Sequence, residues 1–177
     1  MMLSAPLDHT CKSIVDAIRD DGSILVCTGS WLRGDDAACL TLCQSLLGIA
    51  GSKVELCEHG LESCPLLSII EARRPEKLVI CDAAHIPDLA PGSLVELELE
   101  ELEKEVVSLS THSLSQSLLL GKVKNLFPDL EIKILAVNVA RLDVSLELSE
   151  DVRRTIRELL RCVEVETERK DVELSVI

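Results

Sequence analysis

Apolar residues along the chain follow two patterns, one typical of buried strands and one typical of amphipathic helices. Continuous apolar runs predict buried strands at residues 23–28, 53–57, 77–83 and 131–139. A further run, "SLVELELE" at 93–100, alternates apolar and charged residues, which predicts a half-exposed strand. Apolar residues at helical spacing predict helices at 7–18, 35–48 and 112–126. They also predict a short helix that begins at Pro65 and is stopped by Pro75, and a last helix that is capped by Ser149 and has its inward residues at 152–163.

Strands that alternate with helices predict an α/β fold: a three-layer sandwich with a twisted, mostly parallel five-stranded sheet and helices on both faces. The 177 residues are expected to form a single domain. Within it we expect an N-terminal helical extension at 1–22, a core at 23–163 and a tail or hairpin at 164–177. Ligands of such folds bind beyond the carboxyl ends of the strands, so we expect a ligand site in the loops that follow the strands.

Charge and composition exclude several classes of protein. The formal net charge of −13 disfavours nucleic acid as a partner and favours a cation or a basic segment. No apolar run reaches the length of a membrane span, and the first residues lack the features of a signal peptide. The eight cysteines form no CxxC pair and mostly lie in apolar runs, so we expect reduced thiols in a cytoplasmic protein.

The segment "TGSWLRGDDAAC" joins the first buried strand to a helix and carries two adjacent acids. Gly29 and Gly34 have the spacing of a phosphate-binding loop, but Asp35 and Asp36 stand where that loop needs lysine and serine or threonine. Two carboxylates repel a phosphate, so nucleotide binding through this loop is rejected. One interpretation of the pair is a helix start, with Asp35 as N-cap and Asp36 against the helix dipole.

Two further side chains give the pair a second interpretation. Asp82 ends the buried strand "KLVICD", and His112 begins the helix "HSLSQSLLL". Each has a structural explanation when taken alone, as a strand-end acid or a packed histidine. Together with the acidic loop they form a possible three-ligand site for zinc, nickel or manganese. Nothing resembles a Ser-His-Asp or Cys-His assembly, so we assign no catalytic residue.

The order of these pieces resembles the nickel–iron hydrogenase maturation endopeptidases. The matching segments, in chain order, are "ILVCTGSWLRGDDAA", "PEKLVICDAAHIPDLAPGSLVELE", "VVSLSTHSLSQSLLL", "FPDLEIKILAVNV" and "LELSEDVRRTI". The resemblance extends over roughly Ser23 to Val163. It departs from the family pattern at Ser30, Cys39, Cys57–Gly60 and Val139.

The resemblance implies both a site and an activity. By position, Asp36, Asp82 and His112 match the family's metal-binding residues, and Gly29 and Gly34 allow the loop to turn so that Asp36 is aimed at the cleft. The implied reaction removes the C-terminal extension of a hydrogenase large-subunit precursor after nickel insertion. The nickel would arrive with that substrate, and zinc or cadmium would substitute for it. Neither nucleic acid nor a membrane is implied as a partner.

Two other functions are left open by the sequence. The chain could be a non-cleaving assembly factor that docks the large subunit through the same metal cleft. It could also be a small-molecule-binding α/β domain in which the acids only cap helices. The ion, if bound, could either take part in the chemistry or serve only for recognition.

Overall fold

The computed structural model describes the backbone of residues 4–101 and 111–175, and their side chains apart from 111–115 and 174–175. The helices and strands follow the order that the apolar pattern predicts. Their bounds are α1 (Leu7–Arg19), β1 (Ser23–Thr28), η1 (Gly34–Ala37), α2 (Ala38–Ala50), η2 (Gly51–Lys53), β2 (Val54–Cys57), η3 (Leu61–Ser63), α3 (Leu66–Arg73), β3 (Lys77–Ala84), β4 (Leu94–Glu98), α5 (Thr111–Leu126), β5 (Glu131–Asn138) and α6 (Glu150–Ser175).

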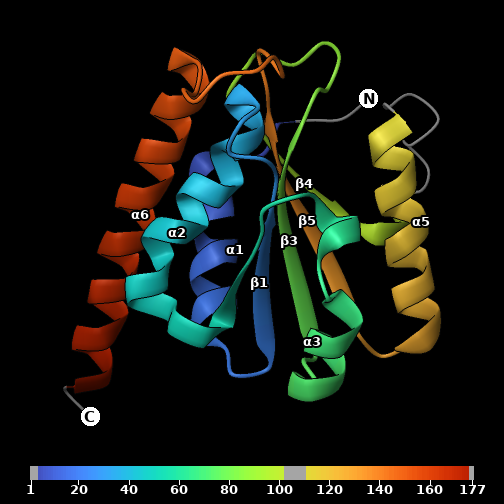
Figure 1. The fold of residues 1–177 in the computed structure, drawn as a ribbon. Coiled ribbons are helices and arrows are strands. Elements are labelled where there is room, and N and C mark those ends of the chain that lie inside the picture. Colours follow the sequence, from blue (N-terminus) through green and yellow to red (C-terminus); the bar gives the residue numbers. More distant parts are fainter. Residues whose placement is uncertain (1–3, 102–110, 176–177) are drawn as a thin grey trace.

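Five strands form one sheet in the order β2-β1-β3-β5-β4. The first four are mutually parallel, whereas β4 runs antiparallel to β5. Helices α1, α2 and α6 cover one face, and α3 and α5 cover the other (Figure 1). The prediction of a three-layer α/β sandwich with a mostly parallel five-stranded sheet is therefore confirmed.

The core lies on both faces of the sheet because the central strands are apolar on both sides. In β1, Leu25 and Cys27 pack toward α1, α2 and α6, and Ile24 and Val26 belong to the cluster that contains α3 and α5 residues. This two-sided burial explains why β1 is a continuous apolar run rather than an alternating one. Each strand thus directs alternate side chains to opposite layers.

The helix predicted at 35–48 begins differently from the expectation. Residues 34–37 form the short 3-10 helix η1, and α2 starts only at Ala38. Neither has a side-chain N-cap bond, so the idea that Asp35 caps this helix was wrong. The carboxylate of Asp35 is used elsewhere, as described below.

The last helix continues well past the end of the predicted core. The expectation of a tail or hairpin at 164–177 was wrong for the described residues, because α6 runs without a break to Ser175. The extension packs beside α1, and Asp171 and Lys170 of α6 pair with Arg19 and Asp16 of α1 at 2.6 Å and 2.8 Å. These long-range pairs hold a segment whose own apolar pattern is weak.

Six of the eight cysteines form disulfides, so the expectation of reduced thiols throughout was wrong. The pairs are Cys11–Cys162, Cys27–Cys43 and Cys57–Cys64, with Cα atoms 6.1, 6.3 and 5.3 Å apart. Those separations lie in the usual range for disulfides. The first pair joins α1 to α6, the second joins β1 to α2, and the third closes the loop after β2. Only Cys39 and Cys81 remain as thiols, and both are buried.

Among residues 4–101 and 111–175, no helix combines the length and the apolar character that crossing a membrane requires.

Candidate functional site

The carboxyl edge of the sheet brings the two predicted aspartates into one neighbourhood. Asp82 lies near the end of β3, and Asp36 lies in η1, which follows β1. Because β1 and β3 are adjacent and parallel, the loops that leave them emerge side by side. The first turn of α5 lies at the same edge of the sheet (Figure 1).

Asp35 is fully buried, and its hydrogen bonds join η1 to the segment between β5 and α6. Its carboxylate accepts hydrogen bonds from the backbone N–H of Ala140 at 2.9 Å and of Arg141 at 3.2 Å. It also accepts bonds from the backbone N–H and the hydroxyl of Ser149, at 2.6 Å and 2.8 Å. These donors flank the loop between β5 and α6. Asp35 is therefore a structural residue that ties η1 to the start of α6 and has no role in capping α2.

The backbone at Asp36 rests directly on Gly29. A Cβ atom at Gly29 would collide with the carbonyl oxygen of Asp36, and Gly29 has a φ of +149°. Gly34 lies in the left-handed region with a φ of +58°. Both glycines therefore fix the path of the loop that carries Asp36.

Asp82 is buried and is oriented by two donors. Its Oδ1 atom accepts a hydrogen bond from the backbone N–H of Ala83 at 2.8 Å, and its Oδ2 atom accepts one from Nε2 of Gln116 at 2.7 Å. Gln116 belongs to α5, so the bond joins the strand to the helix that covers it. Each carboxylate oxygen keeps one lone pair for another partner.

The pKa of Asp82 is raised to about 7, mainly by burial and also by the charges of Asp36 and Glu62, against the lowering effect of its two hydrogen bonds. Asp36 and Asp82 also add to the raised pKa of the Cys39 thiol, which burial raises most. The two aspartates thus act on the same small region of the protein. Charge repulsion between them is a cost that a bound cation would remove.

Thr28 places an unsatisfied hydroxyl beside this region. Cys27 pairs with Cys81 in the β1–β3 register, so Thr28 and Asp82 occupy the next position along the two strands. Side chains alternate along a strand, which puts both on the face covered by α5. Within the described part of the chain, the fully buried Thr28 hydroxyl has no hydrogen-bond partner.

The third predicted ligand, His112, lies in the first turn of α5, and its side chain is outside the described residues. Position 112 precedes Gln116 by four residues, which is about one helical turn. The bond from Gln116 to Asp82 therefore fixes the part of α5 that lies next to position 112.

Three residues of this neighbourhood were missed by the sequence reasoning: Thr28, Glu62 and Gln116. The spacing of Gln116 from His112 was a usable signal, because residues four apart share a helix face. The effect of the Glu62 charge on the pKa of Asp82 depends on how the loop after β2 folds. The sequence carried no signal for the fold of that loop. Among the side chains that the structure describes, no group of three or more His, Cys, Asp or Glu is arranged to hold a metal ion.

The chain is similar to known proteins in its three-dimensional structure. No protein-family model matches the chain, and no curated protein matches it significantly. Among solved structures, a [NiFe] hydrogenase maturation protease HycI from Thermococcus kodakarensis KOD1 is similar with a TM-score of 0.68 and 22% identity, over 88% of this chain and 97% of that one.

Two further structures carry related titles. The [NiFe] hydrogenase maturation protease HybD from Thermococcus kodakarensis has a TM-score of 0.60 and 22% identity, over 81% of this chain and 98% of that one. The hydrogenase maturating endopeptidase HybD from E. coli has a TM-score of 0.59 and 21% identity, over 83% of this chain and 93% of that one. At these identities the likeness establishes the fold.

Proposed function

We propose that this protein is an endopeptidase that removes the C-terminal extension from the large-subunit precursor of a nickel–iron hydrogenase after nickel insertion. Three solved structures that share its fold are described as hydrogenase maturation proteases or endopeptidases. Two parts of the family-like motifs, the loop that carries Asp36 after β1 and the end of β3 at Asp82, lie at the carboxyl edge of the sheet.

The observation that carries the proposal is the pairing of Asp36 with the buried Asp82. Two carboxylates in one partly buried region repel each other, and burial with the charge of Asp36 raises the pKa of Asp82 to about 7. The donor set fits a cation, because a cation would offset the repulsion between the two carboxylates and Asp82 keeps free lone pairs. The unsatisfied hydroxyl of Thr28 adds a polar group next to Asp82.

We assign Asp36, Asp82 and His112 as the ligands of nickel that arrives in the precursor. Carboxylate oxygen and imidazole nitrogen suit nickel and zinc, so zinc or cadmium should substitute in a binding experiment. A bound cation of this kind can polarise a peptide carbonyl or lower the pKa of bound water.

Neighbouring residues of the chain hold Asp36 and Asp82 in place. The hydrogen bond from Gln116 holds the Asp82 carboxylate in one orientation. The contact with Gly29 fixes the backbone of Asp36, and the four hydrogen bonds to Asp35 fix the adjacent residue. A site that is preorganised in this way can bind the metal ion of the precursor without first changing its conformation.

The partner in this proposal is the hydrogenase precursor, and the reaction takes place in the cytoplasm. Three disulfides are unusual for that compartment, although intracellular proteins of hyperthermophiles are a known exception. The net charge of −13 disfavours nucleic acid as a partner. We propose no membrane partner.

Incubation of the purified protein with a nickel-loaded precursor tests the activity. Mass spectrometry should show a shorter large subunit with the wild-type protein and with Asp129→Asn, an exposed acid after α5. Asp82→Asn should abolish the cleavage. A stable complex without cleavage would identify an assembly factor instead, and neither binding nor cleavage would overturn the proposed function.

A further inference from the structure

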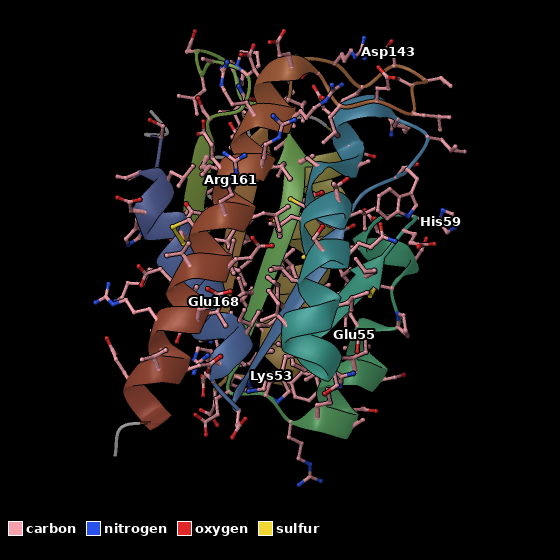
Figure 2. All side chains as sticks on the ribbon, turned by 90° about the vertical axis from the view of Figure 1, so that its left-hand side faces the viewer. Lys53, Glu55, His59, Asp143, Arg161 and Glu168 are labelled. Atoms are coloured by element: carbon pink, nitrogen blue, oxygen red, sulfur yellow. A yellow bond between two sulfur atoms is a disulfide. The ribbon has the colours of Figure 1, made fainter. Side chains whose placement is uncertain are left out.

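Exposed apolar side chains gather beside the candidate site, on the loop between β5 and α6 and on the loop after β1. Val144 is 90% exposed, Leu146 is 82% exposed and Leu32 is 62% exposed. We call these three residues the apolar patch. Figure 2 shows Asp143, next to Val144, at the opposite end of the molecule from Lys53, which precedes β2.

Backbone pairing brings the three residues together. The N–H of Ser145 donates to the carbonyl of Leu32 at 3.1 Å, and the N–H of Gly34 donates to the carbonyl of Ser145 at 2.9 Å. Arg33 and Ser145 are thus partners in a parallel bridge. Leu32, Val144 and Leu146 therefore lie close together, each directly next to the paired backbone of the two loops.

Hydrogen bonds connect the segment that carries the patch to the loop that carries Asp35 and Asp36. Asp35 accepts hydrogen bonds from Ala140 and Arg141 before the patch and from Ser149 after it. Asp36 is the next residue in the chain, only four residues beyond Leu32. The patch therefore keeps a fixed relation to the carboxylate that we assign to the metal.

Two ion pairs lie beside the patch. Arg141 lies 3.8 Å from Asp143, and Arg153 lies 3.9 Å from Glu147. Arg141 also donates to the carbonyl of Glu147 at 3.4 Å. The neighbourhood of the patch is close to neutral although the whole chain carries a net charge of −13. Such a surface suits an apolar segment better than a basic one.

We propose that the apolar patch docks an apolar stretch of the hydrogenase precursor next to the bond that is cut. This inference rests on the proposed function. A protease holds its substrate as an extended chain, at about 3.3 Å per residue, so several residues beside the cut bond must lie along this edge. The patch occupies that edge, and docking there would cover its three side chains while the metal of the precursor meets Asp36 and Asp82.

The test compares two double variants with the wild-type protein. Val144→Ser with Leu146→Ser removes the patch. Val165→Ser with Leu126→Ser removes two other exposed apolar residues, which are 61% and 62% exposed and lie on α6 and at the end of α5. Binding and cleavage of the nickel-loaded precursor are measured for each, together with binding of zinc alone and the melting temperature.

The patch variant should raise KM for the precursor at least tenfold, while its kcat, zinc affinity and melting temperature stay within twofold or a few degrees of wild type. The control variant should cleave like the wild type. If both variants bind and cleave equally well, the docking inference fails and the proposed function stands. If the wild-type protein neither binds nor cleaves the precursor, both fail. A wild-type dimer that the patch variant converts to a monomer would show that a second copy covers the patch, which also overturns the inference.

Discussion

Asp35 and Asp36 are neighbours in the sequence but serve different purposes in the folded protein. The carboxylate of Asp35 is fully buried and accepts four hydrogen bonds from residues that flank the β5–α6 loop. Asp36 is only half-buried, and its charge raises the pKa of Asp82. One acid therefore stabilises the fold, and the other belongs to the candidate metal site.

Substitution of each aspartate should separate these purposes. Asp35→Ala leaves several buried donors without an acceptor and should lower the free energy of unfolding by about 3 kcal/mol. Asp36→Ala should change it by less than about 1 kcal/mol while weakening zinc binding at least tenfold. Urea denaturation and a zinc titration measure the two quantities. Equal destabilisation by both variants would contradict a structural role for Asp35 and a metal-binding role for Asp36.

The raised pKa of Asp82 predicts a pH dependence of stability in the metal-free protein. Asp82 titrates at about 7 in the folded state and near 4 in the unfolded chain. Between these values the folded protein keeps a proton that the unfolded chain has released. The free energy of unfolding should therefore fall as the pH rises from about 4 to 7.

Asp82→Asn cannot titrate at this position, so it serves as the reference for that measurement. Denaturation at a series of pH values should show the wild type losing stability relative to Asp82→Asn as the pH rises from about 4 to about 7. A constant difference between the two proteins over this range would show that Asp82 is not shifted.

At the scale of elements, the loop between β1 and α2 depends on one close backbone approach. Gly29→Ala puts a Cβ atom against the carbonyl of Asp36, which must move the loop. Gly48→Ala in α2 meets nothing within 4 Å and favours the helix. We expect Gly29→Ala to weaken zinc binding at least tenfold and Gly48→Ala to leave it unchanged. Calorimetric titration of both variants checks this, and unaltered binding in Gly29→Ala would contradict it.

Most elements could be predicted from the sequence because their apolar patterns match their burial. The buried runs became β1, β2, β3 and β5, and the alternating run became the antiparallel strand β4. The two larger errors, the short η1 helix before α2 and the extension of α6 to Ser175, have a common cause. Both depend on partners far away in the sequence, such as Ser149 for Asp35 and Arg19 for Asp171.

The aspartates of the candidate site could be predicted from the sequence, but the contacts around them could not. Strand ends and loop acids are visible in the sequence, which is why Asp36 and Asp82 could be placed at one edge of the sheet. The hydrogen bond from Gln116 to Asp82 and the unsatisfied hydroxyl of Thr28 depend on how α5 and β1 face β3. Those relations follow from packing and register, which local patterns do not contain.

At the scale of the whole molecule, disulfides join elements that lie far apart in the chain. Cys11–Cys162 spans 151 residues and links the first helix to the last. A crosslink that closes a loop of this length is worth about 4 kcal/mol or more in chain entropy. The ion pairs between α1 and α6 support the same contact.

The number of thiols in the unfolded protein tests this description. Alkylation in denaturant without reductant should modify two cysteines, Cys39 and Cys81, and alkylation after reduction should modify all eight. Mass spectrometry counts the added groups. Eight modified cysteines before reduction would show that the disulfides are absent from the purified protein.

We propose that Asp36, Asp82 and His112 share one cation in the working protein. Crystals soaked with zinc and measured at the zinc absorption edge test it most directly. We expect one strong anomalous peak at about 2.0–2.2 Å from an oxygen of each aspartate and from a nitrogen of the histidine. A peak elsewhere, or no peak between these three side chains, would contradict it.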